Sequence, residues 1–342
     1  MRILIIKLSA IGDVVQSLPT LEAIKTTFPH STIDWAVEEA AADILEGHPL
    51  IERLLVSRRK AWMGMLTRPS TVLKGLEGIR GFLRELRGRQ YDIAIDLQGL
   101  LKSGVVIGIA RAKRKIGYSG TREFSSCFLN ERLPAYDIEK HALERYLDVA
   151  RYLGAVDPKT TCTLPVSREL NEMRVRLAGM NSEGRKVILI NPMARWKTKL
   201  WQEDRFAQLA DRLIEERNAL VVLTGSPEDR AVTDRIQGMM SRRPVVNWAG
   251  ETTLRELAAL AGLSDLFITT DTGPMHLAAA AGARVVALFG PTAPGRTGPY
   301  GPGHVVVRAG AECSPCFRRE CDQEMRCMRA ISVEEVMKVL PI

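Results

Sequence analysis

Asp271-Thr272-Gly273-Pro274-Met275-His276 joins an apolar run, Leu266–Thr270, to an alanine-rich run that ends at Gly282. An apolar run followed by turn formers and then by alanines predicts a buried strand, a tight turn and the start of a helix. The exposed N–H groups of a helix's first turn, with the positive end of the helix dipole, form a site for phosphate. This stretch therefore predicts an anion-binding βα junction.

Each residue of the junction has an expected task. Thr272 or Asp271 is expected to cap the helix, and Pro274 suits the first turn. Gly273 allows a ligand to approach the backbone closely. His276 lies within the first turn and adds a further donor.

Outward from this junction, short apolar runs alternate with helical stretches along the whole chain. In the first half, strands are expected at residues 3–7, 32–37, 54–56, 93–96 and 115–118, with helices at about 13–28 and 141–153. In the second half, strands are expected at 187–190, 219–224, 244–247, 266–270 and 285–289, with helices at 204–217 and from 229. Repeated βα units with apolar strands predict parallel sheets covered by helices.

A segment with Pro158 and Pro165 separates the two series and is expected to be a linker. The predicted class is α/β, with two Rossmann-like domains, residues 1–165 and 166–342, whose parallel sheets face a central cleft. Ligands of such sheets bind at the carboxyl ends of the strands.

The composition narrows the class of protein. Among 342 residues there is no long uncharged apolar stretch and no apolar N-terminal run of signal-peptide length, which predicts a cytoplasmic protein. The net charge is +8, and residues 53–115 hold fifteen Lys or Arg against four Asp or Glu. This excess is either a solvated helical face or a surface that meets an acidic partner. No zinc finger or RNA-binding aromatic motif accompanies it, so nucleic acid is not the expected partner.

Ser9-Ala10-Ile11-Gly12-Asp13 directly follows the first predicted strand. A carboxylate in the first βα loop is placed for catalysis, although capping of its own helix explains Asp13 equally simply. A lone Gly12 does not make the G-x-G-x-x-G dinucleotide motif, which disfavours an NAD enzyme.

Two further strand ends carry charged residues. Lys199, in the loop after residues 187–190, is either a diphosphate ligand or a surface lysine beside Trp201. Glu228 and Asp229 follow Gly225-Ser226-Pro227, and either carboxylate is able to hold ribose hydroxyls or to cap the helix.

Four cysteines, Cys313, Cys316, Cys321 and Cys327, follow the spacing C-x2-C-x4-C-x5-C. Zinc or an iron–sulfur cluster is one interpretation, but the spacing matches neither common pattern. A reduced structural loop is the favoured prediction, so no metal and no cofactor are expected.

Taken in order, the motifs resemble the bacterial heptosyltransferases, glycosyltransferase family 9. The motifs that carry this resemblance are Lys7-Leu8-Ser9-Ala10-Ile11-Gly12-Asp13, Asp34-Trp35-Ala36-Val37-Glu38-Glu39, Asp96-Leu97-Gln98-Gly99-Leu100-Leu101-Lys102-Ser103, Thr121-Arg122-Glu123, His141-Ala142-Leu143-Glu144-Arg145, Asp271-Thr272-Gly273-Pro274-Met275-His276, Phe289-Gly290-Pro291-Thr292 and the cysteine loop at residues 313–327. The segment around Trp35 is most similar to heptosyltransferase I, and the cysteine loop to heptosyltransferase II.

The resemblance implies a GT-B fold and transfer of heptose from ADP-heptose to the inner core of lipopolysaccharide, with inversion. It implies that Asp13 is the general base and that Lys199 stabilises the departing ADP without a metal. The nucleotide-sugar would be bound by the C-terminal domain, through Asp229, Asp271, Thr272, Gly273, Pro274 and His276.

The acceptor, Kdo-bearing lipid A or the first heptose, would be bound by the N-terminal domain. The residues implied for it are Gly12, Arg58, Arg59, Lys60, Gln98 and Arg122. The basic excess would also hold the protein peripherally on the anionic cytoplasmic face of the inner membrane. Two other classes fit a GT-B fold: a nucleotide-sugar epimerase, and a non-catalytic binding module at the membrane surface.

Overall fold

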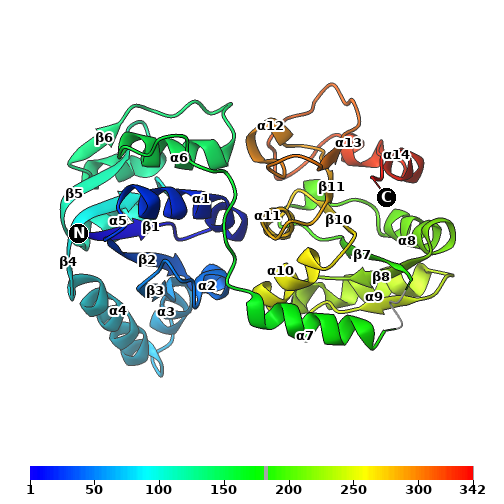
Figure 1. Cartoon of the computed structure of the whole chain (residues 1–342), viewed down its shortest axis with the longest axis horizontal. Coiled ribbons are helices and arrows are strands. Elements are labelled where there is room, and N and C mark those ends of the chain that lie inside the picture. Colours follow the sequence, from blue (N-terminus) through cyan, green and yellow to red (C-terminus); the bar gives the residue numbers. More distant parts are fainter. Residues whose placement is uncertain (181–183, 342) are drawn as a thin grey trace. The chain divides into compact units, whose positions relative to one another are not determined.

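The computed structural model describes residues 1–180 and 184–341 and forms two compact units, Met1–Pro165 and Val166–Ile342. Each unit contains one six-stranded sheet in which all pairings are parallel (Figure 1). The prediction of an α/β protein with two parallel sheets of the GT-B type is confirmed. No helix among the described residues is both long enough and apolar enough to cross a bilayer.

The first sheet has the strand order β3-β2-β1-β4-β5-β6. Its strands are β1 (Arg2–Ile6), β2 (Thr32–Glu38), β3 (Arg53–Ser57), β4 (Gln90–Asp96), β5 (Arg111–Tyr118) and β6 (Glu131–Leu133). The order reverses between β1 and β4, and the carboxyl ends of these two neighbours form the crevice where doubly wound sheets bind ligands.

Helices cover both faces of this sheet (Figure 1). They are α1 (Ile11–Thr27), α2 (Glu39–Leu45), α3 (Arg59–Leu66), α4 (Val72–Arg87), α5 (Leu101–Ile109) and α6 (Ala142–Tyr152), with a 3₁₀ segment η1 (Arg122–Phe128). On one face, Leu4 and Ile6 pack in a buried cluster with Phe82 of α4 and Ile107 of α5. The alternate residues of β1 are equally buried, which is why the strand is apolar throughout.

The second sheet has the order β12-β11-β10-β7-β8-β9. Its strands are β7 (Lys186–Asn191), β8 (Ala219–Leu223), β9 (Val245–Asn247), β10 (Leu266–Thr270), β11 (Val285–Leu288) and β12 (Val305–Val307). Counted within its own unit, each sheet follows the order 3-2-1-4-5-6, the doubly wound Rossmann arrangement. Strands β7 and β10 therefore correspond to β1 and β4.

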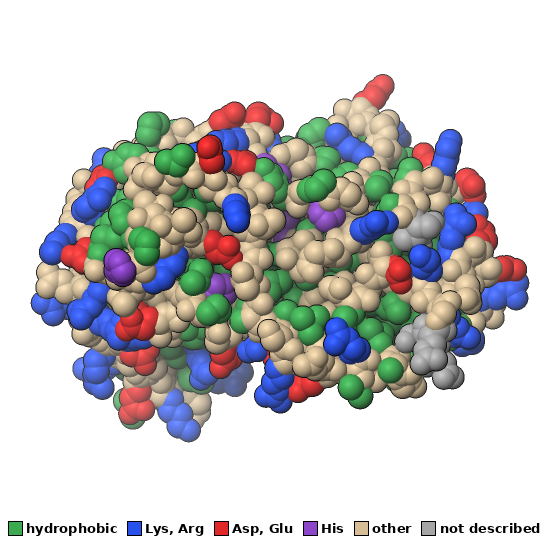
Figure 2. Space-filling model, viewed as in Figure 1, with side chains coloured by type: hydrophobic (Ala, Val, Ile, Leu, Met, Phe, Trp, Pro, Cys, Tyr) green, Lys and Arg blue, Asp and Glu red, His purple; other side chains and the backbone are tan. Residues whose placement is uncertain are grey.

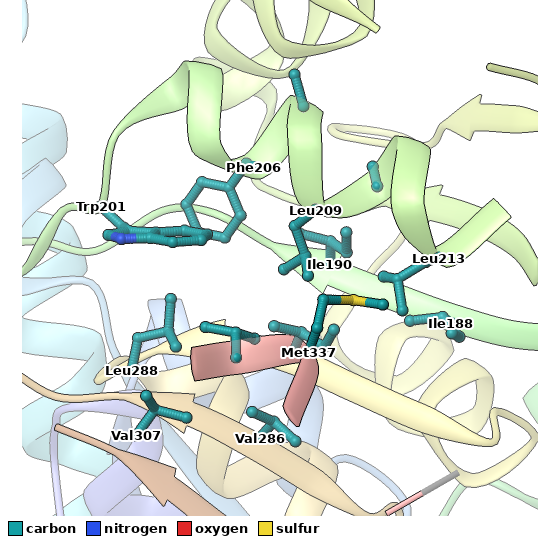
Figure 3. Packing of buried hydrophobic residues seen from close by; sticks show 14 of the residues in the cluster. Ile188, Ile190, Trp201, Phe206, Leu209, Leu213, Val286, Leu288, Val307 and Met337 are labelled. Carbon is teal, nitrogen blue, oxygen red and sulfur yellow. The ribbon is translucent and has the colours of Figure 1, made fainter. Parts of the chain in front are cut away.

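The helices of the second unit are α7 (Ser167–Ala178), α8 (Glu203–Arg217), α9 (Arg230–Met239), α10 (Leu254–Gly262), α11 (Gly273–Ala280), α12 (Pro294–Thr297), α13 (Arg326–Arg329) and α14 (Val333–Lys338), with 3₁₀ turns η2 (Lys197–Lys199) and η3 (Pro227–Asp229). One face of the sheet packs against α8 and α14, where Phe206, Leu209 and Met337 meet the strand residues Ile190 and Leu288 (Figure 3). Each such fully buried side chain contributes about 1.5–3 kcal/mol.

Two helices of this unit, α7 and α10, lie where the sequence pattern predicts none. Helix α7 carries mostly polar residues, and its buried Glu169 is paired with Arg255 of α10 at 2.7 Å. Thr253 and Glu256 form a capping box at the start of α10. A helix held by a buried ion pair has a weak apolar period, which is why α7 is not apparent in the sequence.

Candidate functional site

Asp13 lies at the third position of α1, in the junction that follows β1. Its Oδ2 accepts a hydrogen bond from the Ala10 N–H at 3.1 Å, and its Oδ1 accepts one from the Tyr146 hydroxyl at 2.7 Å. The side chain is 40% exposed. Asp13 thus caps its helix and still presents a carboxylate to solvent, so helix capping and a catalytic role are compatible for this residue.

Lys7 is a buried cation behind Asp13. Its side chain is 3% exposed, and its ammonium group donates to the Leu97 carbonyl at 3.2 Å and to the Tyr146 hydroxyl at 2.8 Å. The Asp13 carboxylate is 3.8 Å away. Burial lowers the pKa of Lys7, while the charges of Asp13 and Asp96 oppose that change. Burial, together with the carboxylate of Asp13, raises the pKa of Tyr146 well above its ordinary value, so its hydroxyl stays a donor.

Asp96, at the end of β4, builds the adjacent turn. Its buried carboxylate accepts from the N–H groups of Gln98 and Gly99 and from the Ser103 hydroxyl. Gly99 has φ +67°, a conformation that favours glycine. Burial raises the pKa of Asp96, and these hydrogen bonds oppose the rise. The turn holds Gln98, whose Oε1 accepts from the Ser9 N–H at 3.0 Å.

A pocket with a cavity volume of about 60 Å³ opens at this edge of the first sheet. Its lining comes from the ends of β4 and β5, from the loop after β6 and from α6, and comprises Asp96, Leu97, Gln98, Gly99, Tyr118, Thr121, Tyr136, Arg145 and Tyr146. The Arg145 guanidinium stacks on the Tyr136 ring at 4.8 Å, and its Nε is buried without a hydrogen-bond partner among the described residues. An unsatisfied guanidinium N–H in a pocket is suited to an anionic ligand.

The remaining residues predicted for the acceptor are spread over the same unit. Arg58 and Arg59, at the start of α3, pair with Glu39 at 3.1 Å and with Glu38 at 3.4 Å. Lys60 is exposed on α3, and Gly12 is buried in α1. The backbone of Arg122 begins η1, whereas its side chain lies outside the described residues. The structure brings Gln98 close to the Asp13 loop.

Sequence reasoning missed the partners that surround Asp13. Lys7 and Tyr146 are 139 residues apart, and Lys102, which contacts both Ser9 and Glu38, comes from α5. A charged residue inside an otherwise apolar strand end, as Lys7 is, was a usable signal because buried lysines need partners.

In the second unit, Asp271 follows β10 and is 5% exposed. Its Oδ2 pairs with the Lys199 ammonium at 2.6 Å and accepts from the Thr292 hydroxyl at 2.6 Å. The expectation that Asp271 or Thr272 caps α11 with its side chain is wrong. Thr272 occupies the N-cap position, but its side chain makes no capping hydrogen bond, and the Asp271 carboxylate is committed to Lys199.

The start of α11 therefore keeps its N–H groups free of a side-chain cap. Gly273 and Pro274 form the first turn, as expected, and that turn carries no acidic residue. His276 follows in the same turn and is partly exposed. No acidic side chain of this turn therefore neutralises the positive end of the helix dipole.

The turn after β8 is a capping box. The Asp229 carboxylate accepts from both the N–H and the hydroxyl of Ser226 at 2.8 Å. Glu228, beside it, is exposed, and hydrogen bonds from its own N–H and the Ser226 hydroxyl lower the pKa of Glu228. Of the two carboxylates, Glu228 has the greater freedom to meet a ligand.

The cysteine loop holds free thiols, and the N–H groups of Gln323 and Met325 point at Cys321 Sγ at 3.3 Å. Burial raises the pKa of the Cys327 thiol. Across residues 1–180 and 184–341, no three His, Cys, Asp or Glu side chains are arranged to hold a metal ion. The metal-free loop stays a prediction.

Comparison with known proteins identifies the family to which this chain belongs. The sequence profile of Glycosyltransferase family 9 (heptosyltransferase) matches residues 79–326. Lipopolysaccharide heptosyltransferase 1 of Pseudomonas aeruginosa is 29% identical over 325 residues, which cover 94% of this chain and 87% of that protein.

Two solved structures share the fold of the whole chain. A glycosyl transferase family 9 structure from Veillonella parvula superposes with a TM-score of 0.80 at 23% identity, covering 98% of this chain and 95% of the other. Escherichia coli heptosyltransferase WaaC with ADP superposes with a TM-score of 0.78 at 24% identity, covering 99% and 98%. With a profile match over most of its length and the same fold throughout, this chain belongs to glycosyltransferase family 9, the heptosyltransferases.

Proposed function

We propose that this protein transfers a heptose from ADP-heptose to the inner core of lipopolysaccharide, with inversion at the anomeric carbon. The observation that carries the proposal is the half-exposed carboxylate of Asp13 at the carboxyl edge of the first sheet, in a chain of the heptosyltransferase family. A single general base suffices for a one-step inverting displacement.

In this reaction, the acceptor hydroxyl attacks the anomeric carbon as its proton passes to Asp13. The bond from that carbon to the diphosphate oxygen breaks, and ADP leaves with the electron pair. Negative charge grows on the diphosphate, and the Lys199 ammonium and the uncapped N–H groups at the start of α11 would stabilise it. Glu228 or Asp229 would hold the ribose.

The acceptor would be recognised by its anionic groups. Arg145 and Gln98 line the pocket next to the Asp13 loop and suit a sugar carboxylate such as that of Kdo. Arg58, Arg59, Lys60 and Arg122 would meet further carboxylates or phosphates. Because the motifs resemble heptosyltransferases I and II, the proposed acceptor is Kdo-bearing lipid A or the first heptose.

The helices α3 and α4 would hold the protein at the cytoplasmic face of the inner membrane. Residues 58–87 contain eight Lys or Arg against two Glu. Met63, Leu73 and Leu76 are exposed among them, at 53%, 72% and 45%. In Figure 2, Lys and Arg side chains gather at the lower left, in the region where Figure 1 places α3 and α4. Exposed apolar groups within a basic surface suit an anionic lipid interface.

The activity is tested by measuring ADP release from ADP-heptose with and without Kdo-bearing lipid A. A transferase releases ADP only when the correct acceptor is present, and a first-heptose acceptor in a parallel reaction distinguishes the two positions. An epimerase would convert ADP-heptose without acceptor, and a binding module would release no ADP under either condition. Either of these last results overturns the proposal.

Membrane association is tested by flotation with phosphatidylglycerol and phosphatidylcholine vesicles. Binding to the anionic vesicles only, weakened by salt, is expected because the attraction is electrostatic. Leu73→Ser should reduce flotation. Val175→Ser on α7, equally exposed at 74%, is the matched control and should not. Equal flotation of the wild-type protein with both kinds of vesicle would contradict membrane binding through α3 and α4. Equal flotation of Leu73→Ser and Val175→Ser would also contradict it.

A further inference from the structure

Three side chains form a continuous hydrogen-bonded chain in the first unit. Lys7 Nζ donates to the Tyr146 hydroxyl at 2.8 Å, and that hydroxyl donates to Asp13 Oδ1 at 2.7 Å. Lys7 also lies over the Tyr146 ring, 4.4 Å from its centroid. Lys7 and Tyr146 are buried, whereas Asp13 is 40% exposed. A buried positive charge is thus connected, through one hydroxyl, to the exposed carboxylate.

The contacts also fix the rotation of the carboxylate. Tyr146 holds Oδ1 from the interior, and the Ala10 N–H holds Oδ2 at 3.1 Å. A carboxylate oxygen accepts more than one hydrogen bond. Oδ1 accepts from the Tyr146 hydroxyl and also lies 3.8 Å from the Lys7 ammonium, which makes protonation of Oδ1 unfavourable and assigns Oδ2 as the oxygen that takes a proton from a substrate.

We propose that Tyr146 and Lys7 are positioning residues for Asp13: they orient its carboxylate so that Oδ2 receives the acceptor proton, and they keep it ionised between turnovers. This inference rests on the proposed function, because it concerns the same base. Neither residue touches the reacting atoms. Their effect comes from a hydrogen bond and a positive charge that favour the ionised carboxylate.

Other charged groups surround this chain. The charge of Asp96, from β4, raises the pKa of Lys7, whereas the charges of Arg145 of α6 and Lys102 of α5 lower it. Arg145 also acts on Tyr146. These groups remain in a variant that removes only the Tyr146 hydroxyl, so such a variant isolates the hydrogen bond.

A purely structural role is the competing explanation. Lys7 donates to the Leu97 carbonyl at 3.2 Å and so ties the end of β1 to the loop after β4. If this were its whole purpose, its loss would lower stability and total activity but would leave the pH profile unchanged. The pH dependence of kcat/KM therefore distinguishes the two roles.

The first experiment compares Tyr146→Phe with Tyr91→Phe. The two hydroxyls each donate to a carboxylate at 2.7 Å, Tyr91 to the buried Asp34 at the opposite end of the strands. Tyr146→Phe should lower kcat by roughly 10- to 100-fold, the range for a hydrogen bond to a charged group. The KM for ADP-heptose should stay unchanged, and the acidic limb of kcat/KM should move up by about one pH unit. Tyr91→Phe should change only stability.

The second experiment uses Lys7→Met, which keeps the length of the side chain and removes its charge. The acidic limb should again move to higher pH, because the ionised carboxylate loses a favourable charge. Combined with Tyr146→Phe, its effect on kcat should be less than multiplicative, since the two residues act through one chain.

The proposal is overturned if the wild-type protein transfers heptose and Tyr146→Phe keeps the wild-type rate and pH profile. It is also overturned if the rate falls with no shift of the acidic limb, which is the structural outcome. A wild-type protein that releases no ADP with any acceptor refutes instead the function on which the inference rests. Because Tyr146→Phe retains the buried ring, the test stands even if Lys7→Met does not fold.

Discussion

The two sheets have the same strand order, and in both a lysine follows the first strand and an aspartate lies at the carboxyl end of the fourth. In the first unit these are Lys7 and Asp96, and in the second they are Lys199 and Asp271. In the second unit the pair is in direct contact, at 2.6 Å. In the first unit Lys7 instead reaches Tyr146, and Asp96 is satisfied by backbone N–H groups.

This difference shows how one topology supports two chemistries. The lysine of the first unit is directed, through Tyr146, at a third residue, Asp13, which is an exposed carboxylate at a helix start. The helix start of the second unit has no acidic residue and no side-chain cap. The first edge is suited to accept a proton and the second to bind an anion.

The largest effect on the rate of transfer is expected at Asp13, the carboxylate that distinguishes the first unit from the second. Asp13→Asn removes the proposed base and should reduce transfer by roughly 10²–10⁴-fold. Binding of ADP, measured by calorimetry, should persist because the nucleotide is assigned to the second unit. A variant with a near wild-type rate would place the base elsewhere.

A somewhat smaller effect is expected from the lysine of the second unit. Lys199→Met removes a donor to the leaving group and should lower kcat by about 10²–10³-fold. The acidic limb of the pH profile should stay at its wild-type position, in contrast to Lys7→Met. If both lysine variants shift the limb equally, the proposed division of labour between the units is wrong.

The turn after β8 offers a smaller and more local test. Glu228→Gln should raise the KM for ADP-heptose by roughly tenfold, the value of one hydrogen bond to a charged group. Asp229→Asn should instead lower the melting temperature, because Asp229 caps its turn through Ser226. The reverse pattern would assign the ribose to Asp229.

The smallest effect concerns stability, and each unit contains a histidine that tests it: His48 is buried and His304 is partly buried. His48 accepts from the Leu50 N–H and lies 3.2 Å from the Thr163 carbonyl, and burial lowers the pKa of His48 from 6.5. Burial likewise lowers the pKa of His304 in the second unit. The unfolded chain then binds protons near pH 6.5 that the folded chain does not.

Stability must therefore fall as the pH drops below 6.5, by at most about 1.4 kcal/mol per pH unit for each histidine. Urea denaturation at pH 7.5 and pH 5.5 should show a weaker pH dependence in His48→Gln than in the wild type. His304→Gln provides the same comparison for the other unit. An unchanged pH dependence in both variants would mean that neither histidine is coupled to folding.

Local patterns predicted five of the six strands of each sheet and the junctions at the strand ends, but missed the three-residue edge strands β6 and β12. The apolar run Leu266–Thr270 forms a strand, and a helix begins at the turn Thr272–Pro274, as predicted. Such elements are predictable because a buried parallel strand or a helix start depends on residues that are neighbours in the sequence. The heptosyltransferase family was also predicted from the order of the motifs, and the comparisons confirm it.

What escaped prediction depends on contacts between distant residues. The chain from Lys7 to Tyr146 joins β1 to α6, and Lys199 meets Asp271 across 72 residues. No periodicity encodes such pairs. The expected side-chain cap on α11 was wrong for the same reason, since a distant lysine took the carboxylate that the local pattern assigned to the helix.

Each unit is also a single uninterrupted stretch of chain, and the sequence passes from one to the other once, at Pro165–Val166. Each sheet draws all of its strands from its own stretch. One genetic crossover at that point would therefore exchange a whole unit without dividing a sheet. With the proposed assignment of the acceptor to the first unit and the donor to the second, such a crossover would combine a new pair of substrates while each half kept its own buried core.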